Sequence, residues 1–139
     1  MNAHRFLSAS HAFWYRMSRG RILTKMRGAD ILLLTTTGRR TGKNRTTPLI
    51  FVQDGENLGV VASNGGRDHD PAWWTNLQHN PRAQVQVKGN RKTVIAEKAG
   101  PEDTTRLWSM LTKAYPAYND YQKKTKRTIP VVILRPGSE

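Results

Sequence analysis

The sequence predicts an α+β fold in which an antiparallel sheet curls into a barrel. Two observations lead to this prediction. Short apolar or alternating runs follow one another with hairpin turns between them, and no helix recurs between them as it would in βαβ units. Amphipathic segments are confined to a few positions along the chain. Closing the sheet into a barrel would cover the edges that such strands leave exposed.

The expected strands alternate in polarity or are rich in β-branched residues, as buried and half-buried strands are. The turn signals Asp54-Gly55 and Gly89-Asn90 predict two hairpins. The chain is thus expected to run as a helix, five or six strands interrupted by short helices, and a last strand. The strand segments are ILLLTTT (31–37), PLIFVQ (48–53), NLGVVAS (57–63), AQVQVKG (83–89), RKTVIAEKA (91–99) and TIPVVILRP (128–136).

Three segments predict helices. Residues 4–18 repeat aromatic and aliphatic residues at helical spacing. In DPAWWTNLQHNP (70–81), we expect Asp70 to cap a helix that begins at Pro71 and ends before Asn80-Pro81, with both tryptophans on one face. The preceding RDHD (67–70) is then a polar loop rather than a catalytic cluster. Residues 101–115 begin with Pro and two acids, which suits a helix N-terminus.

Length and composition indicate one domain over residues 1–139, with 1–29 as an N-terminal helical segment. The sequence contains no cysteine, which excludes disulfides and thiolate chemistry. The apolar runs ILLL (31–34) and VVIL (131–134) are far shorter than the ~18 residues of a membrane-spanning helix. The N-terminus lacks the apolar core of a signal peptide. These features predict a cytoplasmic protein.

The chain is strongly basic, with 23 Lys and Arg against 10 Asp and Glu and a net charge of +13. A field of this sign attracts polyanions, whether nucleic acid, anionic lipid or a multiply charged small molecule. Charge alone does not choose among them.

Known catalytic motifs are absent from the sequence. Gly38 and Gly42 are one residue too close for a P-loop, and Asn44 stands at the magnesium-ligand position. VASNG (61–65) has Val61 where a nucleophile elbow needs glycine. The four histidines have no metal-ligand spacing. We therefore expect neither a covalent catalyst nor a metal site.

The stretch TTTGRRTGKNRTTP (35–48) predicts an anion-binding loop. No Asp or Glu occurs between Ile31 and Gln53. Glycines would let backbone N–H groups approach an anion, and arginines offer planar forks for phosphate or carboxylate. The alternative is a solvated hairpin tip. A second glycine-rich turn, SNGG (63–66), lies after the next expected hairpin and favours a binding site.

Four segments in this order and spacing resemble the deazaflavin-dependent nitroreductase family: TTTGRRTGKNRTTPL, VVASNGG, HDPAWWTNLQHNP and AYPAYNDYQKKTKRTIPVVIL. The resemblance runs from Ile31 to Pro136. It implies a split β-barrel related to FMN-binding flavoreductases, and a reductase of actinobacterial type that uses coenzyme F420. Such enzymes transfer a hydride from the reduced deazaflavin to an electron-poor acceptor, such as a quinone or a nitro compound.

The resemblance also implies which residues hold the cofactor. The phosphodiester and oligoglutamate tail would lie on the basic loop, the ring system would lie beside the next strands, and the short tryptophan helix would close the pocket. The tail residues are Arg39, Arg40, Thr41, Lys43 and Arg45; the ring residues are Thr46, Thr47, Pro48, Leu49, Ile50, Val61, Ala62, Ser63 and Asn64; the closing residues are Ala72, Trp73, Trp74 and Asn76.

Tyr115, Tyr118 and Tyr121 are the candidate catalytic donors. An acceptor gains negative charge as the hydride arrives, and a phenol with a pKa near ~10 remains a neutral donor at pH 7. In relatives the counterpart of Tyr118 contacts cofactor and substrate most clearly, so Tyr118 also counts as cofactor-binding. The alternative is that the three are half-buried aromatics of the barrel. Ser63 is a second candidate donor, or simply a turn residue.

Two positions depart from the family's pattern. Ile50 stands where a nitroimidazole-reducing member has a tyrosine, and Asn64 replaces a lysine of some members. Both put the acceptor in question and leave quinones as the expected substrates.

Other interpretations remain open at this stage. An FMN-dependent flavoreductase on the same barrel, a basic nucleic-acid-binding module, or a cofactor binder without turnover would each fit parts of the pattern; on the deazaflavin interpretation no nucleic-acid partner is expected. The basic N-terminal segment suits either peripheral contact with an anionic membrane or packing on the barrel. The chain could be a monomer or a homodimer.

Overall fold

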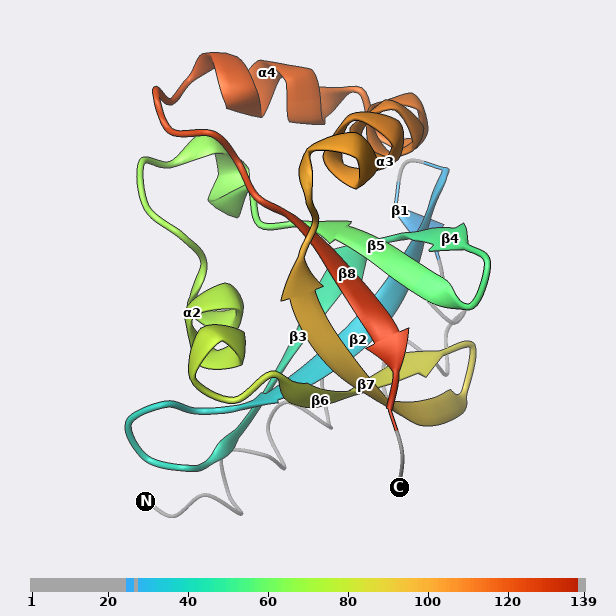
Figure 1. The fold of residues 1–139 in the computed structure, drawn as a ribbon, viewed down its shortest axis with the longest axis vertical. Coiled ribbons are helices and arrows are strands. Elements are labelled where there is room, and N and C mark those ends of the chain that lie inside the picture. The colour runs from blue at the N-terminus through green and yellow to red at the C-terminus, as the bar shows by residue number, and fades with distance from the viewer. Residues whose placement is uncertain (1–24, 27, 138–139) are drawn as a thin grey trace.

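The computed structural model describes residues 25–26 and 28–137, and Figure 1 shows their arrangement. The helix predicted over residues 4–18 lies outside the described residues. Within the described part, eight strands form a single antiparallel sheet with three α-helices and a short 3-10 helix, which confirms the α+β prediction. The elements are β1 (Lys25–Met26), β2 (Ala29–Thr37), β3 (Asn44–Ile50), β4 (Val52–Asp54), β5 (Asn57–Val61), η1 (Asn64–Gly66), α2 (Ala72–His79), β6 (Arg82–Val87), β7 (Asn90–Lys98), α3 (Pro101–Ala114), α4 (Ala117–Lys123) and β8 (Val131–Pro136).

The sheet curls into a split barrel because the continuous segment β3–β4 pairs with strands at both ends of the sheet. The strand order is β1-β2-β6-β7-β8-β5-β4. β3 stands outside this order and pairs with β2. β3 leads directly into β4 through Phe51, whose N–H donates to the carbonyl of Asp30 at 3.1 Å. The chain thus pairs with β2 before Phe51 and with β5 after it. This change of partner brings the two ends of the sheet together.

The predicted strand 48–53 is therefore wrong as a single element. Residues up to Ile50 belong to β3 and residues from Val52 belong to β4. The hairpin with the next strand is nevertheless present, because β4 pairs with β5. The second predicted hairpin is also present, with its turn at Lys88-Gly89, one residue earlier than expected, because both residues adopt positive φ.

Two apolar cores lie on the two faces of the central strands. Leu32 and Leu34 of β2 enter one core, while Ala29 and Ile31 of the same strand enter the other. β8 does the same: Val132 and Leu134 face the first core, and the alternate residues face the second. Successive side chains of a strand point to opposite faces, so a strand that is buried on both faces reads as an unbroken apolar run.

The helices cover the sheet at two places (Figure 1). α3 and α4 lie together over the second core, to which α3 contributes Leu107 and Leu111. α2 lies beside the β2–β3 hairpin and buries Trp73, Trp74 and Leu77, as its predicted aromatic face requires.

The predicted cap of α2 is wrong. Pro71 is the cap residue, and no side chain caps the helix. The carboxylate of Asp70 instead forms an ion pair with Arg127 at 2.9 Å. α4 was not predicted as a helix, because its seven residues between Pro116 and a lysine-rich segment are too few to show a period.

Candidate functional site

The basic stretch forms the tip of the β2–β3 hairpin rather than a long loop. Strand pairing continues to Thr37 and Asn44, so only residues 38–43 form the tip. The N–H of Gly38 donates to the carbonyl of Lys43 at 2.7 Å, and the N–H of Gly42 donates to the carbonyl of Gly38 at 2.8 Å. The N–H groups of these two glycines are therefore used within the tip and do not point toward a ligand.

The buried amide of Asn76 holds this tip against α2. Its Oδ1 accepts from the backbone N–H of Arg39 at 3.2 Å and from the Arg39 guanidinium at 3.0 Å. Its Nδ2 donates to the hydroxyl of Thr36 at 3.1 Å. Asn76 is 3% exposed and Thr36 is 1% exposed, so water does not compete for these bonds. Arg39 is thus held in place before any ligand arrives.

A first cavity of about 410 Å³ lies between this tip and the start of α2. Three arginines line it, and no carboxylate does. An anion would meet positive charge there without a competing acid. The lining residues are Gly38, Arg39, Arg40, Thr41, Arg45, Thr47, Pro71, Ala72, Trp73 and Asn76.

A second cavity of about 430 Å³ adjoins the first. The two share Thr47, Pro71 and Trp73 and so form one groove with a cationic end and an aromatic end. The second cavity is lined by Thr47, Pro48, Leu49, Ile50, Val61, Ser63, Asn64, Gly65, Arg67, Pro71, Trp73, Tyr115, Tyr118 and Tyr121.

The three tyrosines form one cluster in the second cavity. The rings of Tyr115 and Tyr118 meet edge to face with centroids 5.0 Å apart, and the hydroxyls of Tyr115 and Tyr121 lie 3.3 Å apart. Burial raises the pKa of the Tyr118 phenol above its ordinary value, and the neighbouring phenols of Tyr115 and Tyr121 raise this pKa further. Tyr118 therefore remains a neutral hydrogen-bond donor throughout the physiological range.

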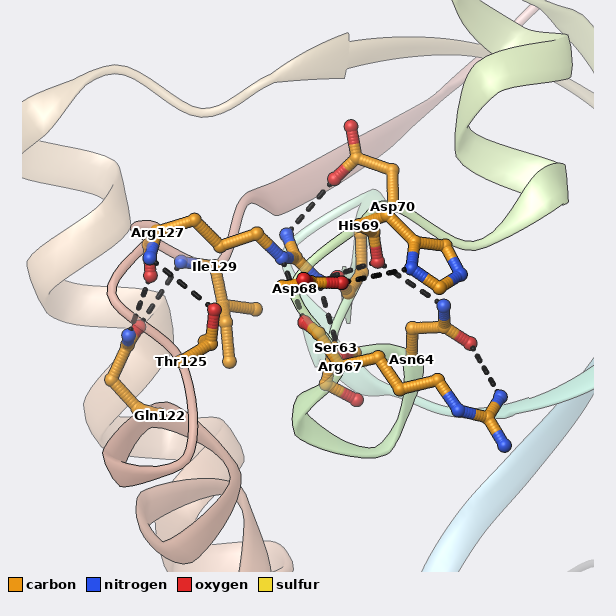
Figure 2. A network of polar contacts seen from close by, with 11 residues as sticks. Ser63, Asn64, Arg67, Asp68, His69, Asp70, Gln122, Thr125, Arg127 and Ile129 are labelled. Carbon is orange, nitrogen blue, oxygen red and sulfur yellow. Dashed lines mark hydrogen bonds and ion pairs between the residues drawn. The ribbon is translucent and has the colours of Figure 1, made fainter.

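The loop from Ala62 to Asp70 carries Ser63, Asn64 and Gly65 to the second cavity, and Arg127 holds it (Figure 2). The Arg127 guanidinium donates to several carbonyls of this loop and pairs with Asp70. This role could not be predicted from the sequence, because Asp70 lies 57 residues and Ala62 lies 65 residues away from Arg127.

Most of the predicted site residues line the groove. Four do not. Thr46 bonds the hydroxyl of Thr35 at 2.8 Å, while Ala62 and Trp74 lie in the first core. Lys43 belongs to the hairpin tip and lines neither cavity. Side chains alternate between the two faces of β3, and Thr47 lies on the face that lines the groove. Its neighbour Thr46 therefore points to the other face.

Residues that the sequence analysis did not assign to the site also line the groove. Gly65 and Pro71 lie inside the motifs SNGG and DPAWW, so proximity to a predicted site residue was the available signal. Arg67 had been placed in a polar loop, and it lines the second cavity with its guanidinium 3.4 Å from the Asn64 amide oxygen.

In the part of the chain that the structure describes, no group of three or more His, Asp or Glu side chains is arranged to hold a metal ion. None of the helices there has the length and hydropathy needed to cross a membrane.

The residues present suit a ligand with an anionic end and a flat apolar part. Arg39, Arg40 and Arg45 supply charge to the first cavity, whereas Pro71 and the indole of Trp73 form apolar walls between the two cavities. A deazaflavin with a phosphodiester and a glutamate tail has both parts.

The chain is similar to known proteins over most of its length. The profile of the F420H(2)-dependent quinone reductase family matches residues 7–136. An F420H(2)-dependent quinone reductase of Mycobacterium tuberculosis is 40% identical over 128 residues, which is 89% of this chain and 86% of the relative. The solved structure of an F420-H2 dependent reductase, FDR-A, has a TM-score of 0.71 at 37% identity and covers 78% of this chain and 95% of its own. Another, described as a domain-swapped dimer, has a TM-score of 0.72 at 34% identity, covering 89% of this chain and 98% of its own.

These matches confirm the split barrel and the resemblance to deazaflavin-dependent reductases, and they favour F420 over FMN and over a nucleic-acid-binding role. A profile match over nearly the whole length and 40% identity to a curated relative show that the chain belongs to the F420H(2)-dependent quinone reductase family, and it is accordingly an oxidoreductase that uses reduced coenzyme F420.

Proposed function

We propose that the chain transfers a hydride from reduced coenzyme F420 to a quinone, with the anionic end of the cofactor in the first cavity and the reaction in the second. The observation that carries this proposal is the groove itself. Its cationic end has three arginines and no acid among its lining residues, and its other end carries three tyrosines.

The arginines of the first cavity bind the anionic end. Guanidinium forks match phosphate and carboxylate oxygens and form stronger hydrogen bonds than neutral donors. Asn76 fixes Arg39 in advance, so less side-chain freedom is lost on binding. Thr41 adds a hydroxyl, and Lys43 adds a longer-range charge from the exposed tip.

The second cavity holds the reacting groups. The bound deazaflavin supplies the hydride. Tyr118 donates a hydrogen bond to the acceptor oxygen on which negative charge develops, and its raised pKa keeps this proton in place. Tyr115 and Tyr121 both hold the Tyr118 ring by edge-to-face packing, and Ser63 lies on the opposite loop as a second donor.

A quinone is the proposed acceptor. The side chain of Ile50 gives the second cavity an apolar wall, and the tyrosine rings offer faces on which a flat ring can pack. The curated relatives carry quinone reductase in their names, which supports the same choice. Nitro compounds are the second candidate class, because they too are electron-poor acceptors.

We further propose that the chain forms a homodimer in the cytoplasm and contacts membranes peripherally through its basic N-terminal segment. The dimer is supported by the similar solved structure described as domain-swapped. Light scattering tests the first statement, and sedimentation with anionic vesicles tests the second against a variant that lacks residues 1–24.

The central proposal is tested by fluorescence titration with oxidised coenzyme F420 and, in parallel, with FMN. We expect saturable, stoichiometric binding of F420 alone. Replacing Arg39, Arg40 and Lys43 together by alanine should weaken this binding at least tenfold, because the first cavity loses two of its three arginines and the tip loses its lysine. Binding of FMN in place of F420, or binding of neither, would contradict the proposal.

The matched control replaces Arg82, Arg91 and Lys92, which are exposed on β6 and β7 and line neither cavity of the groove. It lowers the net charge by the same amount. If both triple variants lost affinity equally, the effect would come from overall charge and the placement of the tail would be wrong.

A further inference from the structure

Arg127 lies in the segment between α4 and β8, and its guanidinium is enclosed by the loop from Ala62 to Asp70 (Figure 2). The Nε donates to the carbonyl of Arg67 at 3.0 Å, and Nη1 bonds the Asp70 carboxylate at 2.9 Å. The Nη2 group lies within 3.1–3.2 Å of three more carbonyls, those of Ala62, Ser63 and His69. The Arg127 side chain therefore bonds both ends of the loop and Arg67 between them.

The backbone of Arg127 is fixed to α4 at the same time. The Gln122 side chain, in the last turn of α4, donates from Nε2 to the carbonyl of Arg127 at 2.8 Å. Its Oε1 accepts from the N–H of Ile129 at 3.0 Å, and the N–H of Arg127 donates to the Thr125 hydroxyl at 3.3 Å. The guanidinium thus binds the loop, while the backbone of the same residue is fixed to α4.

The loop and α4 also touch directly. Gly66 packs so closely on α4 that a Cβ there would lie 2.9 Å from the carbonyl oxygen of Tyr121. Asn64 closes the loop from within, since its Nδ2 donates to the carbonyl of His69 at 3.1 Å. The loop, α4 and Arg127 therefore form one connected unit.

The loop and α4 each form part of the wall of the second cavity. The loop supplies Ser63, Asn64 and Gly65, and α4 supplies Tyr118 and Tyr121. Arg127 lines neither cavity, so it acts on the site through the groups that it holds. Asp70 is next to Pro71, which lines both cavities, so the ion pair also fixes the entry into α2.

We propose that Arg127 is a positioning residue that locks the loop 62–70 to α4 and so sets the width of the second cavity, where the acceptor meets the cofactor. This inference rests on the proposed function of that cavity. An arginine is required because its planar fork serves acceptors in several directions from three nitrogens, whereas the ammonium of lysine offers its donors from a single atom. Replacement by lysine keeps the charge opposite Asp70 and releases carbonyls of the loop.

The test compares Arg127→Lys with the wild-type chain and with Arg106→Gln. Arg106 is a matched control, because it bonds Asp54 and Asp103 at 2.7 and 2.8 Å and lies outside the groove. Three quantities are measured: hydrogen–deuterium exchange of the amides of residues 62–70 without ligand, the Kd for oxidised coenzyme F420, and kcat and KM for reduction of a soluble quinone.

For Arg127→Lys we expect faster exchange in residues 62–70 and a kcat/KM for quinone lower by about 10- to 100-fold, the loss typical of a reacting group misplaced by about 1 Å. The Kd for F420 should stay within about threefold, because the arginines that hold the anionic tail lie in the first cavity. Arg106→Gln should leave all three quantities near the wild-type values.

Unchanged exchange and unchanged kcat/KM in Arg127→Lys would overturn the proposal. So would an equal loss in Arg106→Gln, or a loss of F420 affinity as large as the loss of rate, because either result would indicate general destabilisation. If Arg127→Lys fails to fold, Asp70→Asn removes only the charged acceptor and should give the same pattern in milder form. A wild-type chain that binds no F420 would refute the proposed function, while the exchange experiment would still decide whether Arg127 locks the loop.

Discussion

At the scale of single residues, Asn76 shows how a buried side chain can serve a binding site without presenting its polar atoms to the ligand. Sequence resemblance placed it among the cofactor-binding residues, and it does line the first cavity. Its amide, however, is engaged with Arg39 and Thr36. We therefore expect Asn76 to act on cofactor affinity by fixing the position of Arg39.

We expect Asn76→Ala to lower the free energy of unfolding by about 1–3 kcal/mol, because the buried Thr36 hydroxyl and the Arg39 N–H lose their partner. The same change should weaken F420 binding. Urea denaturation and fluorescence titration measure the two effects. Gln78→Ala, at an exposed position of the same helix, is the control and should change neither quantity. A variant as stable as the wild type would show that this network does not hold the hairpin tip.

Tyr118 is the residue for which we expect a pH-dependent effect. Its pKa is raised in the folded chain above the ~10 of an exposed phenol, so folding favours the protonated form. Its contribution to stability is fully present below pH ~10 and is lost as the pH rises above that value toward the folded pKa. We expect the stability of Tyr118→Phe to fall less steeply between pH 9 and about 11 than that of the wild type, as measured by urea unfolding.

The same variant tests the proposed donor role at pH 7. Turnover should fall while the Kd for F420 changes little, since the hydroxyl acts on the acceptor. Kinetics equal to those of the wild type would restrict Tyr118 to packing within the aromatic cluster.

At the scale of secondary-structure elements, the contact between η1 and α4 depends on Gly66. Its φ is +86°, and a Cβ would lie 2.9 Å from a backbone oxygen of α4. Gly65 beside it also has a positive φ, of +67°, but a Cβ there would meet nothing within 4 Å. A Cβ at Gly65 would therefore cause backbone strain alone, whereas a Cβ at Gly66 would cause backbone strain and a steric clash.

Gly65→Ala should cost about 1 kcal/mol of unfolding free energy, from the left-handed backbone alone. Gly66→Ala should cost about 3 kcal/mol or more, because backbone atoms of α4 must also move. Thermal or urea unfolding of the two variants gives the difference. Equal costs would mean that η1 and α4 do not pack as closely as described.

Elements determined by local pattern were predicted from the sequence, and those determined by distant partners were not. β2 and α3 were recognised because burial imposes a period of two or of about 3.6 along their own residues. The break at Phe51 was missed because the chain changes strand partner there, and pairing leaves no mark in composition. The cap at Asp70 was wrong because Arg127, distant in sequence, binds that carboxylate.

The candidate site divides in the same way. The basic tip and the tyrosines were found because their chemistry is visible in the residue types. Tertiary contacts, which the sequence does not show, create the adjoining cavities, the contact of Asn76 with Arg39 and the bonds of Arg127 to the loop. The segments that the resemblance pointed to border the groove, and the structure shows which of their side chains face it.

At the scale of the whole molecule, the net charge of +13 acts on a polyanionic cofactor over a longer range than any single contact. We expect the Kd for F420 to rise by about tenfold between 50 and 500 mM salt, as the Debye length shortens from about 14 to 4 Å. Titration at several salt concentrations measures this rise. A deazaflavin without the phosphodiester and glutamates is the control ligand and should show little dependence; an equal dependence would place the effect outside the first cavity.

Thr47, Pro71 and Trp73 border both cavities, whereas Arg39, Arg40 and Arg45 border only the first and the tyrosines only the second. In evolutionary terms, this divides the groove into positions with different freedom to vary. We expect that residues around the tyrosines can be exchanged during evolution, so that new acceptors are used with the same cofactor. We expect a change at one of the three shared positions to alter cofactor affinity and acceptor choice together. Diversification within the family is therefore expected to spare these three positions and to concentrate at the aromatic end.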